Sequence, residues 1–477
     1  MIKFDYKTGK RQGQIICDSD ILATIRNHFS VANKEKKFAP ELKKRFLKDR
    51  KYAITPTGLF SFGFYHEILK YLRDEQITDI ELTDEFKARC KCGFENSEFV
   101  GDLTFDPRYF QQETVEKSIK RGMGTIVIGT GGGKSLTQAF LIENLKKHLP
   151  WNPKVLILVP GLTLVYQLQD DFKSYGVRFD YSGWTGEVDT KKNPISPLQD
   201  TSVVICNNEN FTAKFIDNPW IVDVDLLIVD ECHKVNNNSN ITKLISKIKT
   251  PNRFGFTGSL SDNKLDQWKT IGTFGPIVYE KKSKELRDEG FLTDVVVTAL
   301  QLNHPNKSNT DYKTELDYLY NSEKRNAFIS KVADKMTGNV LIMVNHLIHG
   351  ENLMDAAKKI TDKKVFFVKG EVAVDNRKKI ITLMEGRDDI VCIAMSSIFS
   401  TGINVKNIPN IVFAGLGKSF IRVVQSIGRG LRLHDNKDRL NIFDIFDNLK
   451  YSTTHSEKRR LIYDKEEIKY RLKEIDL

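Results

Sequence analysis

Short runs of consecutive apolar residues alternate with longer stretches of helical periodicity from about residue 101 onward. Apolar runs rich in β-branched residues are typical of strands buried on both faces of a parallel sheet, whose connections are helices. A charged stretch at residues 280–289 interrupts the alternation and divides the runs into two sets. The predicted strands cover residues 125–128, 155–159, 202–206, 226–229 and 253–256, and then 339–344, 364–368, 389–394, 410–414 and 440–446.

This alternation predicts an α/β protein with two parallel-sheet domains in tandem. The first hundred residues are basic and aromatic instead, and they predict a small separate domain. The stretch at residues 456–475 carries dense charge of both signs and predicts a surface helix. The expected organisation is an N-terminal domain (1–100), two α/β domains (101–283 and 284–450) and a C-terminal helix (451–477).

Composition excludes several classes of protein. The 477 residues are 40% hydrophobic and 28% charged, which is ordinary for a globular protein with several cores. No apolar run approaches the roughly 18–20 residues of a membrane span, and the first residues lack the layout of a signal peptide. Six cysteines in a chain of this length do not form a disulfide framework. We therefore expect a cytoplasmic protein. Because Cys90 and Cys92 lack a second pair of ligands at zinc-site spacing, no structural metal is expected.

The net charge of +11 is unevenly distributed. Between residues 36 and 51 there are eight Lys or Arg against two acids, interleaved with Phe38 and Phe46 and followed by Tyr52. Basic residues mixed with aromatic ones fit contact with nucleic-acid phosphates. A solvated basic helix face has the same composition, so this segment permits nucleic-acid binding without establishing it.

The first predicted strand runs into a glycine-rich turn and then a helix. Four glycines between residues 129 and 133 let backbone N–H groups surround a polyphosphate without Cβ clashes, and the helix N-terminus adds partial positive charge. In such a loop Lys134 would reach the β- and γ-phosphates and Ser135 would bind Mg²⁺. The strict pattern has a glycine where Ile128 stands. The predicted phosphate-binding residues are Thr130, Gly131, Gly132, Gly133, Lys134 and Ser135.

An acidic motif, Asp230-Glu231-Cys232-His233, follows the strand predicted at residues 226–229. Carboxylates after a buried strand lie at the carboxyl edge of the sheet, where ligands of open α/β folds bind. There Asp230 would hold Mg²⁺ through water, and Glu231 would orient and deprotonate the attacking water. The two motifs together predict a site that hydrolyses a nucleoside triphosphate.

Two further motifs follow in order along the chain, namely Thr257-Gly258-Ser259 and Gln425-Ser-Ile-Gly428-Arg429-Gly-Leu-Arg432. Together with Lys134 and the Asp230 motif, this order over residues 105–435 resembles superfamily 2 helicases of the DExH type. The resemblance implies two tandem RecA-like domains that use ATP and Mg²⁺. The size of the chain, its basic N-terminal domain and the segment at residues 399–404 most resemble the phage recombination and branch-migration helicases of that superfamily.

The resemblance assigns residues of both domains to the nucleotide. Gln111 would hydrogen-bond the adenine edge, and Arg108 or its neighbour Tyr109 would stack on the adenine face. Gly402 and Asn404 would lie near the nucleotide from the second domain.

The remaining catalytic and coupling roles also follow from the resemblance. Gln425 belongs to the motif from which Arg429 and Arg432 would reach the γ-phosphate, as an arginine finger does. Thr257 and Ser259 would couple the nucleotide site to the cleft between the domains.

Contacts with a tracked nucleic-acid strand are assigned by the same resemblance, through backbone amides and hydroxyl groups. The family commonly has a threonine in the region where this chain reads Cys206-Asn207-Asn208. The assigned residues are Pro160, Thr163, Gln167, Asn207, Asn345, His346, Ser400 and Thr401.

The resemblance implies an ATP-dependent DNA helicase or translocase. We expect branched DNA (Holliday junctions, forks and R-loops) as its substrate, in recombination, replication and repair, with branch migration or fork regression as the outcome. The analogy further suggests a monomer in the cytoplasm, that of the host if the chain is phage-encoded.

Two alternatives stay open at this point. An RNA helicase or a duplex DNA translocase, such as a restriction motor subunit, would carry the same motifs, because phosphate contacts do not distinguish the sugars. A non-catalytic nucleic-acid scaffold is disfavoured, because Lys134, Asp230, Glu231, Arg429 and Arg432 are all retained.

Overall fold

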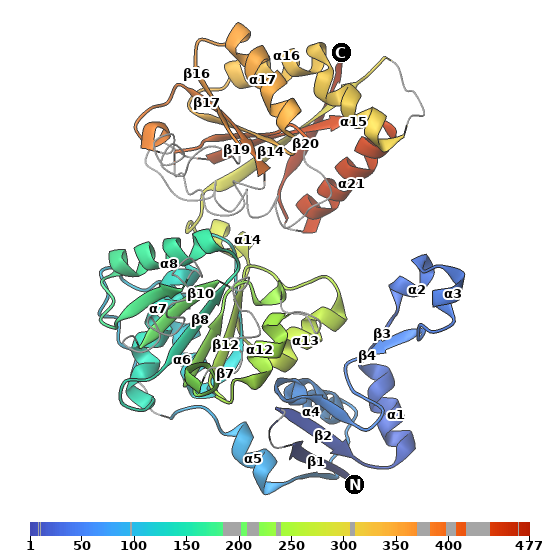
Figure 1. Ribbon diagram of the computed structural model, residues 1–477, viewed down its shortest axis with the longest axis vertical. Coiled ribbons are helices and arrows are strands. Elements are labelled where there is room, and N and C mark those ends of the chain that lie inside the picture. Colours follow the sequence, from blue (N-terminus) through green and yellow to red (C-terminus); the bar gives the residue numbers. More distant parts are fainter. Residues whose placement is uncertain are drawn as a thin grey trace. The chain divides into compact units, whose positions relative to one another are not determined.

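The structure is a computed structural model (Figure 1) that describes residues 1–7, 9, 11–95, 98–184, 202–207, 219–234, 240–305, 311–369, 382–396, 407–415, 439–465 and 467–477. The chain divides into two compact units. The first comprises Met1–Ile128 and Gly133–Lys282, and the second comprises Gly129–Gly132 and Ser283–Leu477.

The N-terminal part of the first unit is a four-stranded sheet in the order β5-β2-β1-β6. Buried and half-buried residues alternate along β1, as expected for a sheet with one face on a core. That core is aromatic, with Phe4, Phe62 and Phe86 buried among one another. The elements are β1 (Ile2–Lys7), β2 (Gln12–Ile16), β5 (Leu59–Ser61), β6 (Ile80–Leu82), α1 (Ser19–His28), η1 (Phe62–Phe64), α4 (Tyr65–Asp74) and α5 (Asp84–Cys90).

The core of this small sheet continues into the larger sheet of the same unit. Met123 and Ile271 belong to the same buried cluster as Phe64, and the Trp268 ring lies 6.0 Å from the Phe64 ring. A side chain at Gly63 would place its Cβ 2.5 Å from the Ile271 carbonyl oxygen, so this approach requires glycine. The two sheets therefore fold against each other as one body.

A two-stranded ribbon projects from the small sheet (Figure 1). Its strands are β3 (Ser30–Ala32) and β4 (Arg50–Tyr52), and the residues between them form α2 (Lys34–Phe38) and α3 (Glu41–Lys44). We call residues 30–52 the basic arm, because they include the basic block of the sequence.

The first large sheet has seven parallel strands in the order β13-β7-β12-β11-β8-β10-β9. Helices α7 and α8 lie on one side of it and α12 and α13 on the other (Figure 1). The elements are β7 (Met123–Ile128), β8 (Val155–Val159), β9 (Tyr181–Trp184), β10 (Val203–Asn207), β11 (Leu226–Val229), β12 (Arg253–Thr257), β13 (Ile277–Lys281), α6 (Tyr109–Arg121), α7 (Lys134–Leu145), η2 (Lys146–His148), α8 (Leu162–Tyr175), α11 (Pro219–Val222), η4 (Cys232–Lys234), α12 (Asn240–Lys247) and α13 (Lys264–Phe274).

The second unit contains another sheet of seven parallel strands, in the order β16-β17-β15-β18-β19-β14-β20. Its inner strand β15 is wholly buried, as its uninterrupted apolar sequence predicts. The elements are α14 (Ser283–Asp288), β14 (Asp294–Asn303), α15 (Tyr312–Asn321), α16 (Glu323–Asp334), β15 (Val340–Val344), α17 (Leu347–Ile360), β16 (Lys364–Val368), β17 (Ile390–Met395), β18 (Asn410–Phe413), β19 (Arg439–Asp447), α21 (Lys450–Lys465) and β20 (Tyr470–Asp476).

The predicted fold class is confirmed, with two parallel α/β sheets in tandem and a small N-terminal sheet. The predicted helix over residues 456–475 is wrong in its second half. Helix α21 ends at Lys465, and Tyr470–Asp476 form the edge strand β20, which pairs with β14. An edge strand keeps one side open to solvent and tolerates charge, so β20 has no apolar run to distinguish it from a surface helix.

None of the helices in the described ranges has the length and apolarity needed to cross a membrane. These ranges also contain no group of three or more His, Cys, Asp or Glu placed to hold a metal ion. All six cysteines are free thiols.

Candidate nucleotide and nucleic-acid site

The glycine-rich loop joins the carboxyl end of β7 to α7. Gly131 and Gly133 each have a φ of +84°, in the left-handed region that favours glycine. The Gly132 N–H donates to the Gly129 carbonyl over 2.9 Å, which closes the turn. Helix α7 begins at Lys134, and the Lys134 Nζ lies 3.5 Å from the carbonyl oxygen of Ile128, at the end of β7. The loop therefore combines a helix N-terminus with a lysine at one point, as phosphate binding requires.

The carboxylates of Asp230 and Glu231 lie at the same edge of this sheet. The Asp230 N–H donates to the Leu158 carbonyl over 2.8 Å, which fixes the chain at the end of β11. Burial and the neighbouring Glu231 charge raise the pKa of Asp230, against the opposing charge of Lys134. Glu231 has a φ of +48°, an unfavourable value for a residue with a side chain, and such strain is found most often at functional sites.

Glu231 stays ionised because of its neighbours. Burial disfavours its charge, but the His233 hydrogen bond and the Lys134 and His233 charges outweigh burial and lower its pKa. The His233 Nδ1 lies 3.3 Å from the Glu231 Oε2 and 2.8 Å from the Thr257 Oγ1. The Thr257 hydroxyl donates to the Ser259 carbonyl over 2.7 Å. A continuous polar chain thus joins Glu231 to the end of β12.

The residues expected to hold Mg²⁺ fit that ion in part. The Asp230 Oδ1 is buried and accepts no hydrogen bond from the part of the chain that the structure describes. A buried carboxylate oxygen without a donor suits a hard cation, directly or through water. The Ser135 hydroxyl is 2.8 Å from the Tyr175 hydroxyl, so Ser135 would exchange this partner on binding the ion.

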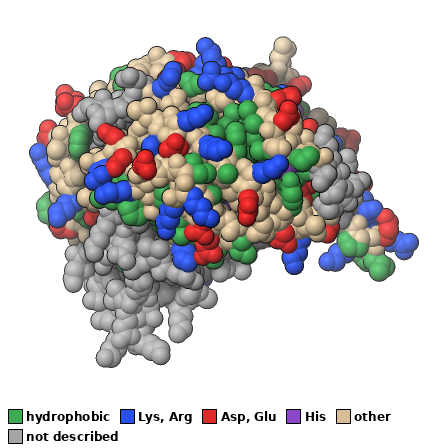
Figure 2. Space-filling model, turned by 90° about the horizontal axis from the view of Figure 1, so that it is seen from above, with side chains coloured by type: hydrophobic (Ala, Val, Ile, Leu, Met, Phe, Trp, Pro, Cys, Tyr) green, Lys and Arg blue, Asp and Glu red, His purple; other side chains and the backbone are tan. Residues whose placement is uncertain are grey.

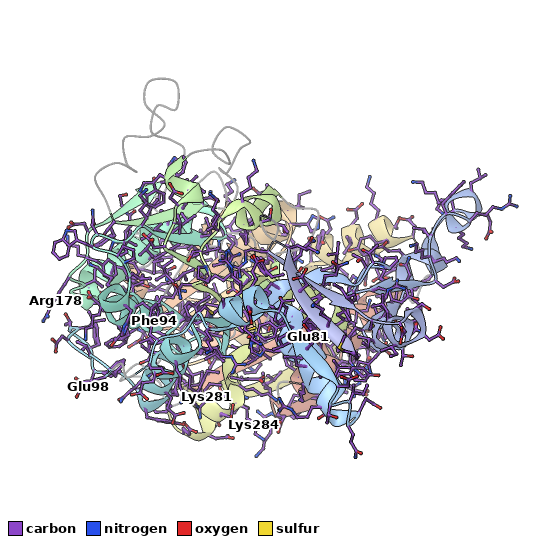
Figure 3. All side chains as sticks on the ribbon, turned by 90° about the horizontal axis from the view of Figure 1, so that it is seen from below. Glu81, Phe94, Glu98, Arg178, Lys281 and Lys284 are labelled. Carbon is purple, nitrogen blue, oxygen red and sulfur yellow. The ribbon has the colours of Figure 1, made fainter. Side chains whose placement is uncertain are left out.

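The residues expected around adenine gather at the start of α6. Gln111 is almost fully buried, and its Nε2 donates to the Gly133 carbonyl over 3.2 Å while its Oε1 accepts from the Arg108 N–H over 2.9 Å. Tyr109 is 49% exposed, and its hydroxyl accepts from the Nζ of Lys281, labelled in Figure 3, over 2.7 Å. Gln111 therefore contacts the glycine-rich loop itself, a contact that the sequence motif did not indicate.

The residues of the first unit that are predicted to contact a nucleic-acid strand also lie at this carboxyl edge. Pro160 follows β8, and α8 begins at Leu162, so Thr163 and Gln167 lie in its first two turns. Asn207, the last residue of β10, has only 3% of its surface exposed. Its predicted contact with a nucleic-acid strand stays a prediction.

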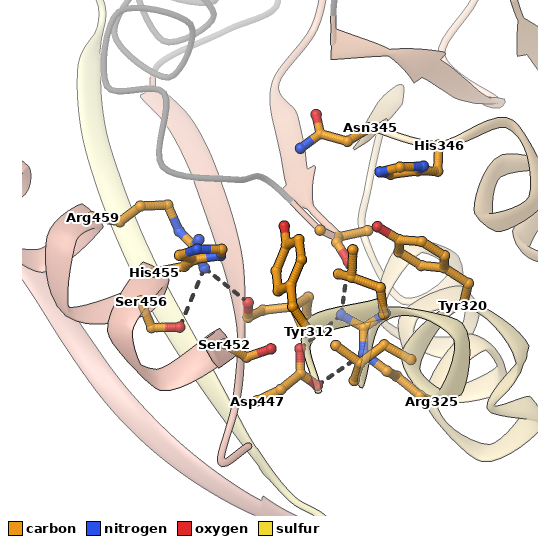
Figure 4. A pocket seen from close by; sticks show the side chains of 15 residues that line it. Tyr312, Tyr320, Arg325, Asn345, His346, Asp447, Ser452, His455, Ser456 and Arg459 are labelled. Carbon is orange, nitrogen blue, oxygen red and sulfur yellow. Dashed lines mark hydrogen bonds and ion pairs between the residues drawn. The ribbon is translucent and has the colours of Figure 1, made fainter. Parts of the chain in front are cut away.

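In the second unit, Asn345 and His346 follow β15 and line a pocket of about 60 Å³ (Figure 4). The Asn345 Oδ1 accepts from the Ser396 hydroxyl, and the His346 ring lies 4.8 Å from the Tyr320 ring. The pocket rests on buried ion pairs. Among them, Arg325 donates to both oxygens of Asp447 over 2.9 Å.

The other predicted residues of the second domain lie outside the described residues. They are Ser400, Thr401, Gly402, Asn404, Gln425, Arg429 and Arg432. Their assigned roles stay predictions.

Comparison with known protein families decides the family. Residues 104–262 match the family described as the res subunit of type III restriction enzymes, and residues 323–434 match the helicase conserved C-terminal domain. The chain belongs to the superfamily 2 helicases. Both matches fall on the α/β domains that carry the motifs, and the predicted enzyme class, an ATP-dependent DNA helicase, is confirmed.

Relatives of this superfamily 2 helicase differ in how much of the chain they match. The "ATP-dependent DNA helicase uvsW" of Enterobacteria phage T4 is 27% identical over 97% of this chain and 97% of its own length. The "Type I restriction enzyme EcoAI endonuclease subunit" of Escherichia coli is 22% identical over 74% of this chain and 47% of its own length.

A solved structure shows the same fold. It is the fragment structure of a putative HsdR subunit of a type I restriction enzyme from Vibrio vulnificus, which is 17% identical over 90% of this chain and 76% of that chain, with a TM-score of 0.58.

The contacts of Gln111 give a first prediction. The variant Gln111→Ala loses the hydrogen bonds to Gly133 and Arg108, each worth about 1 kcal/mol, and so loosens the loop. We expect the KM for ATP to rise about tenfold with a smaller change in kcat, measured as steady-state ATP hydrolysis. The matched control is Gln112→Ala, because the Gln112 side chain donates to Glu116 on the exposed face of α6. Equal KM values for the two variants would contradict a role for Gln111 at the loop.

Proposed function

We propose that this helicase is an ATP-driven motor on DNA and that its substrates are branched, such as Holliday junctions, forks and R-loops. Branch migration or fork regression is the expected outcome. The observation that carries this proposal is the basic arm, which belongs to a domain packed against the first large sheet.

The nucleotide site supports hydrolysis by the following division of roles. Lys134 and the loop N–H groups hold the phosphates, and Glu231 orients and takes a proton from the attacking water. Mg²⁺, held by Asp230 and Ser135, would neutralise charge that develops on the phosphates. In the proposal, Arg429 and Arg432 stabilise that charge from the second domain, together with Gln425 of the same motif.

The chain from Glu231 through His233 to Thr257 supports a coupling role. Loss of the γ-phosphate changes the charge facing Glu231, and two hydrogen-bonded partners connect Glu231 to the end of β12. Thr257 and Ser259 lie where that change would be transmitted beyond the nucleotide. Strand contacts that tighten and loosen in turn would then move the enzyme along DNA.

DNA as the substrate is supported by the relative that matches the whole chain. The phage T4 protein named a DNA helicase aligns with 97% of this chain, so the alignment includes the N-terminal domain. The restriction subunit aligns with 74%. The N-terminal domain lies outside the motor domains and is shared with that DNA helicase. We expect it to be the part that recognises the substrate.

The electrostatics of the basic arm support nucleic-acid contact. Three of its lysines form ion pairs, Lys36 with Asp49, Lys44 with Glu41 and Lys51 with Glu35. Of the other basic residues of the arm, Arg50 donates to Ser30. The following have no acidic partner among the described side chains: Lys34, Lys43, Arg45 and Lys48.

The arm also exposes apolar side chains beside these cations. Phe46 is 87% exposed and Leu42 is 78% exposed. Figure 2 shows the arm as the lobe at the right, where basic, hydrophobic and acidic side chains lie together. A projecting surface of cations and apolar groups fits the phosphates and bases at a DNA branch.

Deleting residues 1–100 would expose Trp268 and Ile271 of the first large domain. The test therefore removes charge from the arm and leaves the N-terminal domain in place. The variant Lys43→Ala/Arg45→Ala/Lys48→Ala is expected to bind four-way junctions at least about tenfold more weakly at low salt, because it loses up to three phosphate contacts. Single-strand-stimulated ATP hydrolysis should change little. Fluorescence anisotropy measures the affinity for the junction, and an ATPase assay measures the rate of hydrolysis.

The control variant is Lys147→Ala/Lys173→Ala/Lys335→Ala, which removes the same charge from exposed positions of the two large domains. Equal loss of junction binding in both triple variants would argue against the arm. Parallel loss of junction binding and ATP hydrolysis in the arm variant would also count against it.

A further inference from the structure

A second basic surface lies at the opposite edge of the first large sheet. A cleft of about 620 Å³ opens where β7 and β13 begin, with Met123 and Ile277 in its floor. Its walls carry Lys91, from the segment after α5, and Lys117, Lys120 and Arg121, from the last turns of α6. Cations from two parts of the chain therefore face one space.

Close backbone contacts hold these two parts together. The Phe94 N–H donates to the Ile119 carbonyl over 3.0 Å, and the Cys92 Sγ donates to the Arg121 carbonyl over 3.3 Å. A Cβ on Gly93 would lie 1.9 Å from the Lys120 carbonyl oxygen, so only glycine permits the approach. Lys91, two residues before Gly93, is thereby fixed beside the end of α6.

The charges of the cleft are incompletely neutralised. Lys117 pairs with Glu113 at 3.1 Å. Arg121 donates instead to the Nδ1 of His66 over 3.2 Å, and burial together with the Arg121 charge lowers the pKa of His66 to about 3, so that this partner is neutral. Lys91 and Lys120 are exposed and have no acidic partner in the described ranges.

Negative groups at the cleft do not offset these cations. Glu95 is the one acid among the lining residues. A helix C-terminus disfavours anions through its free carbonyls, but here the carbonyls of Ile119, Arg121 and Gly122 accept hydrogen bonds from Phe94, Cys92 and Asn252. The cleft therefore presents at least three positive side chains to an anion.

The position of the cleft separates it from the path of a tracked strand. Met123 is the first residue of β7, whereas the glycine-rich loop follows Ile128 at the other end of the same strand. Pro160 follows β8 and Asn207 is the last residue of β10, so both lie at the carboxyl ends of these strands, on the side of the nucleotide. A nucleic-acid segment bound in the cleft is therefore distinct from the strand that the motor pulls.

We propose that this cleft binds the phosphodiester backbone of a duplex arm of the DNA substrate. The cations stand on long side chains along one helix face and a neighbouring segment, a spacing that suits consecutive phosphates. A free phosphate or nucleotide would be held by a nest of backbone N–H groups or a helix N-terminus, whereas α6 offers its C-terminus. The inference rests on the proposed function and adds a second DNA contact to it.

The experiment reverses the two unpaired lysines in the full-length protein. Lys91→Glu/Lys120→Glu is expected to bind a fluorescein-labelled forked DNA at least about tenfold more weakly, with a log–log salt slope smaller by roughly 2, because two phosphate contacts are lost. Single-strand-stimulated ATP hydrolysis should match the wild type. Lys147→Glu/Lys173→Glu is the control of equal charge, and Lys91→Arg/Lys120→Arg should retain binding.

The outcomes separate the two proposals. Equal affinity and salt slope in the cleft and control variants would overturn the cleft as a DNA site. Loss of binding in the arginine variant as well would also overturn it, because charge would then not be the cause. If the wild type binds forks no better than plain duplex, the branched-DNA proposal fails. Weaker duplex binding by the glutamate variant would still support the cleft.

Discussion

The Glu231→Gln enzyme should bind ATP and hydrolyse it roughly 10²–10⁴-fold more slowly than the wild type, the usual contribution of a general base. Glutamine keeps the shape of the side chain but removes the charge that would accept a proton. That charge is maintained by the His233 hydrogen bond and by Lys134. Steady-state ATP hydrolysis with saturating single-stranded DNA measures kcat, and fluorescent-nucleotide binding measures affinity.

A matched control distinguishes this effect from a general loss of charge. Glu113→Gln removes a carboxylate that pairs with Lys117 on the surface of α6, and it should hydrolyse ATP at the wild-type rate. If Glu231→Gln retained more than about a tenth of the wild-type kcat, Glu231 would not be the general base.

The Asp447→Asn protein should lose stability in its second unit by about 3–5 kcal/mol, the usual cost of breaking a buried ion pair from one side. Arg325 is 1% exposed and donates to both Asp447 oxygens, and His304 lies 2.9 Å from the same carboxylate. Asparagine leaves the Arg325 charge buried with no carboxylate opposite it. Chemical denaturation followed by circular dichroism should show the transition of this unit at lower denaturant.

The pH dependence of unfolding provides an independent readout. Burial disfavours the Asp447 charge, but the Arg325 charge and the His304 hydrogen bond outweigh burial and lower its pKa. A lowered pKa stabilises the folded state above the unfolded-state pKa, and this stabilisation is lost as the pH falls below about 4. The Asp447→Asn variant should therefore lose less stability than the wild type as the pH falls through this range.

The control for this prediction is Asp389→Asn, which breaks an ion pair with Arg387 whose two side chains are 40% and 47% exposed. Exposed pairs contribute little to stability, so its unfolding should match the wild type. Equal unfolding of all three proteins would show that the buried pair does not support the second unit.

The sequence predicted the large sheets well because buried parallel strands are apolar along their whole length. The runs at residues 155–159 and 226–229 coincide with the buried strands β8 and β11. The strands that were missed lie toward the edges or are mixed in polarity. Tyr181–Trp184 and Ile277–Lys281 are edge strands, and Asp294–Asn303 begins and ends with polar residues.

The candidate site could be predicted where a motif determines both the residue type and its position relative to a strand or helix. Lys134, Asp230 and Glu231 each follow or begin an element that the apolar pattern locates. The contact of Gln111 with Gly133 was not predictable, because it joins two helix starts that are far apart in sequence. The basic cleft was not predictable either, since Lys91 meets Lys120 only through the packing of Gly93.

The most direct test of the account measures ATP hydrolysis and strand separation on a matched set of single strand, plain duplex, fork, four-way junction and their RNA equivalents. We predict that both activities require Glu231 and that strand separation is fastest on DNA forks and junctions. The proposal of action on branched DNA would be contradicted by equal activity on RNA, by a preference for plain duplex, or by hydrolysis without strand separation. The assignment to superfamily 2 would hold in each case.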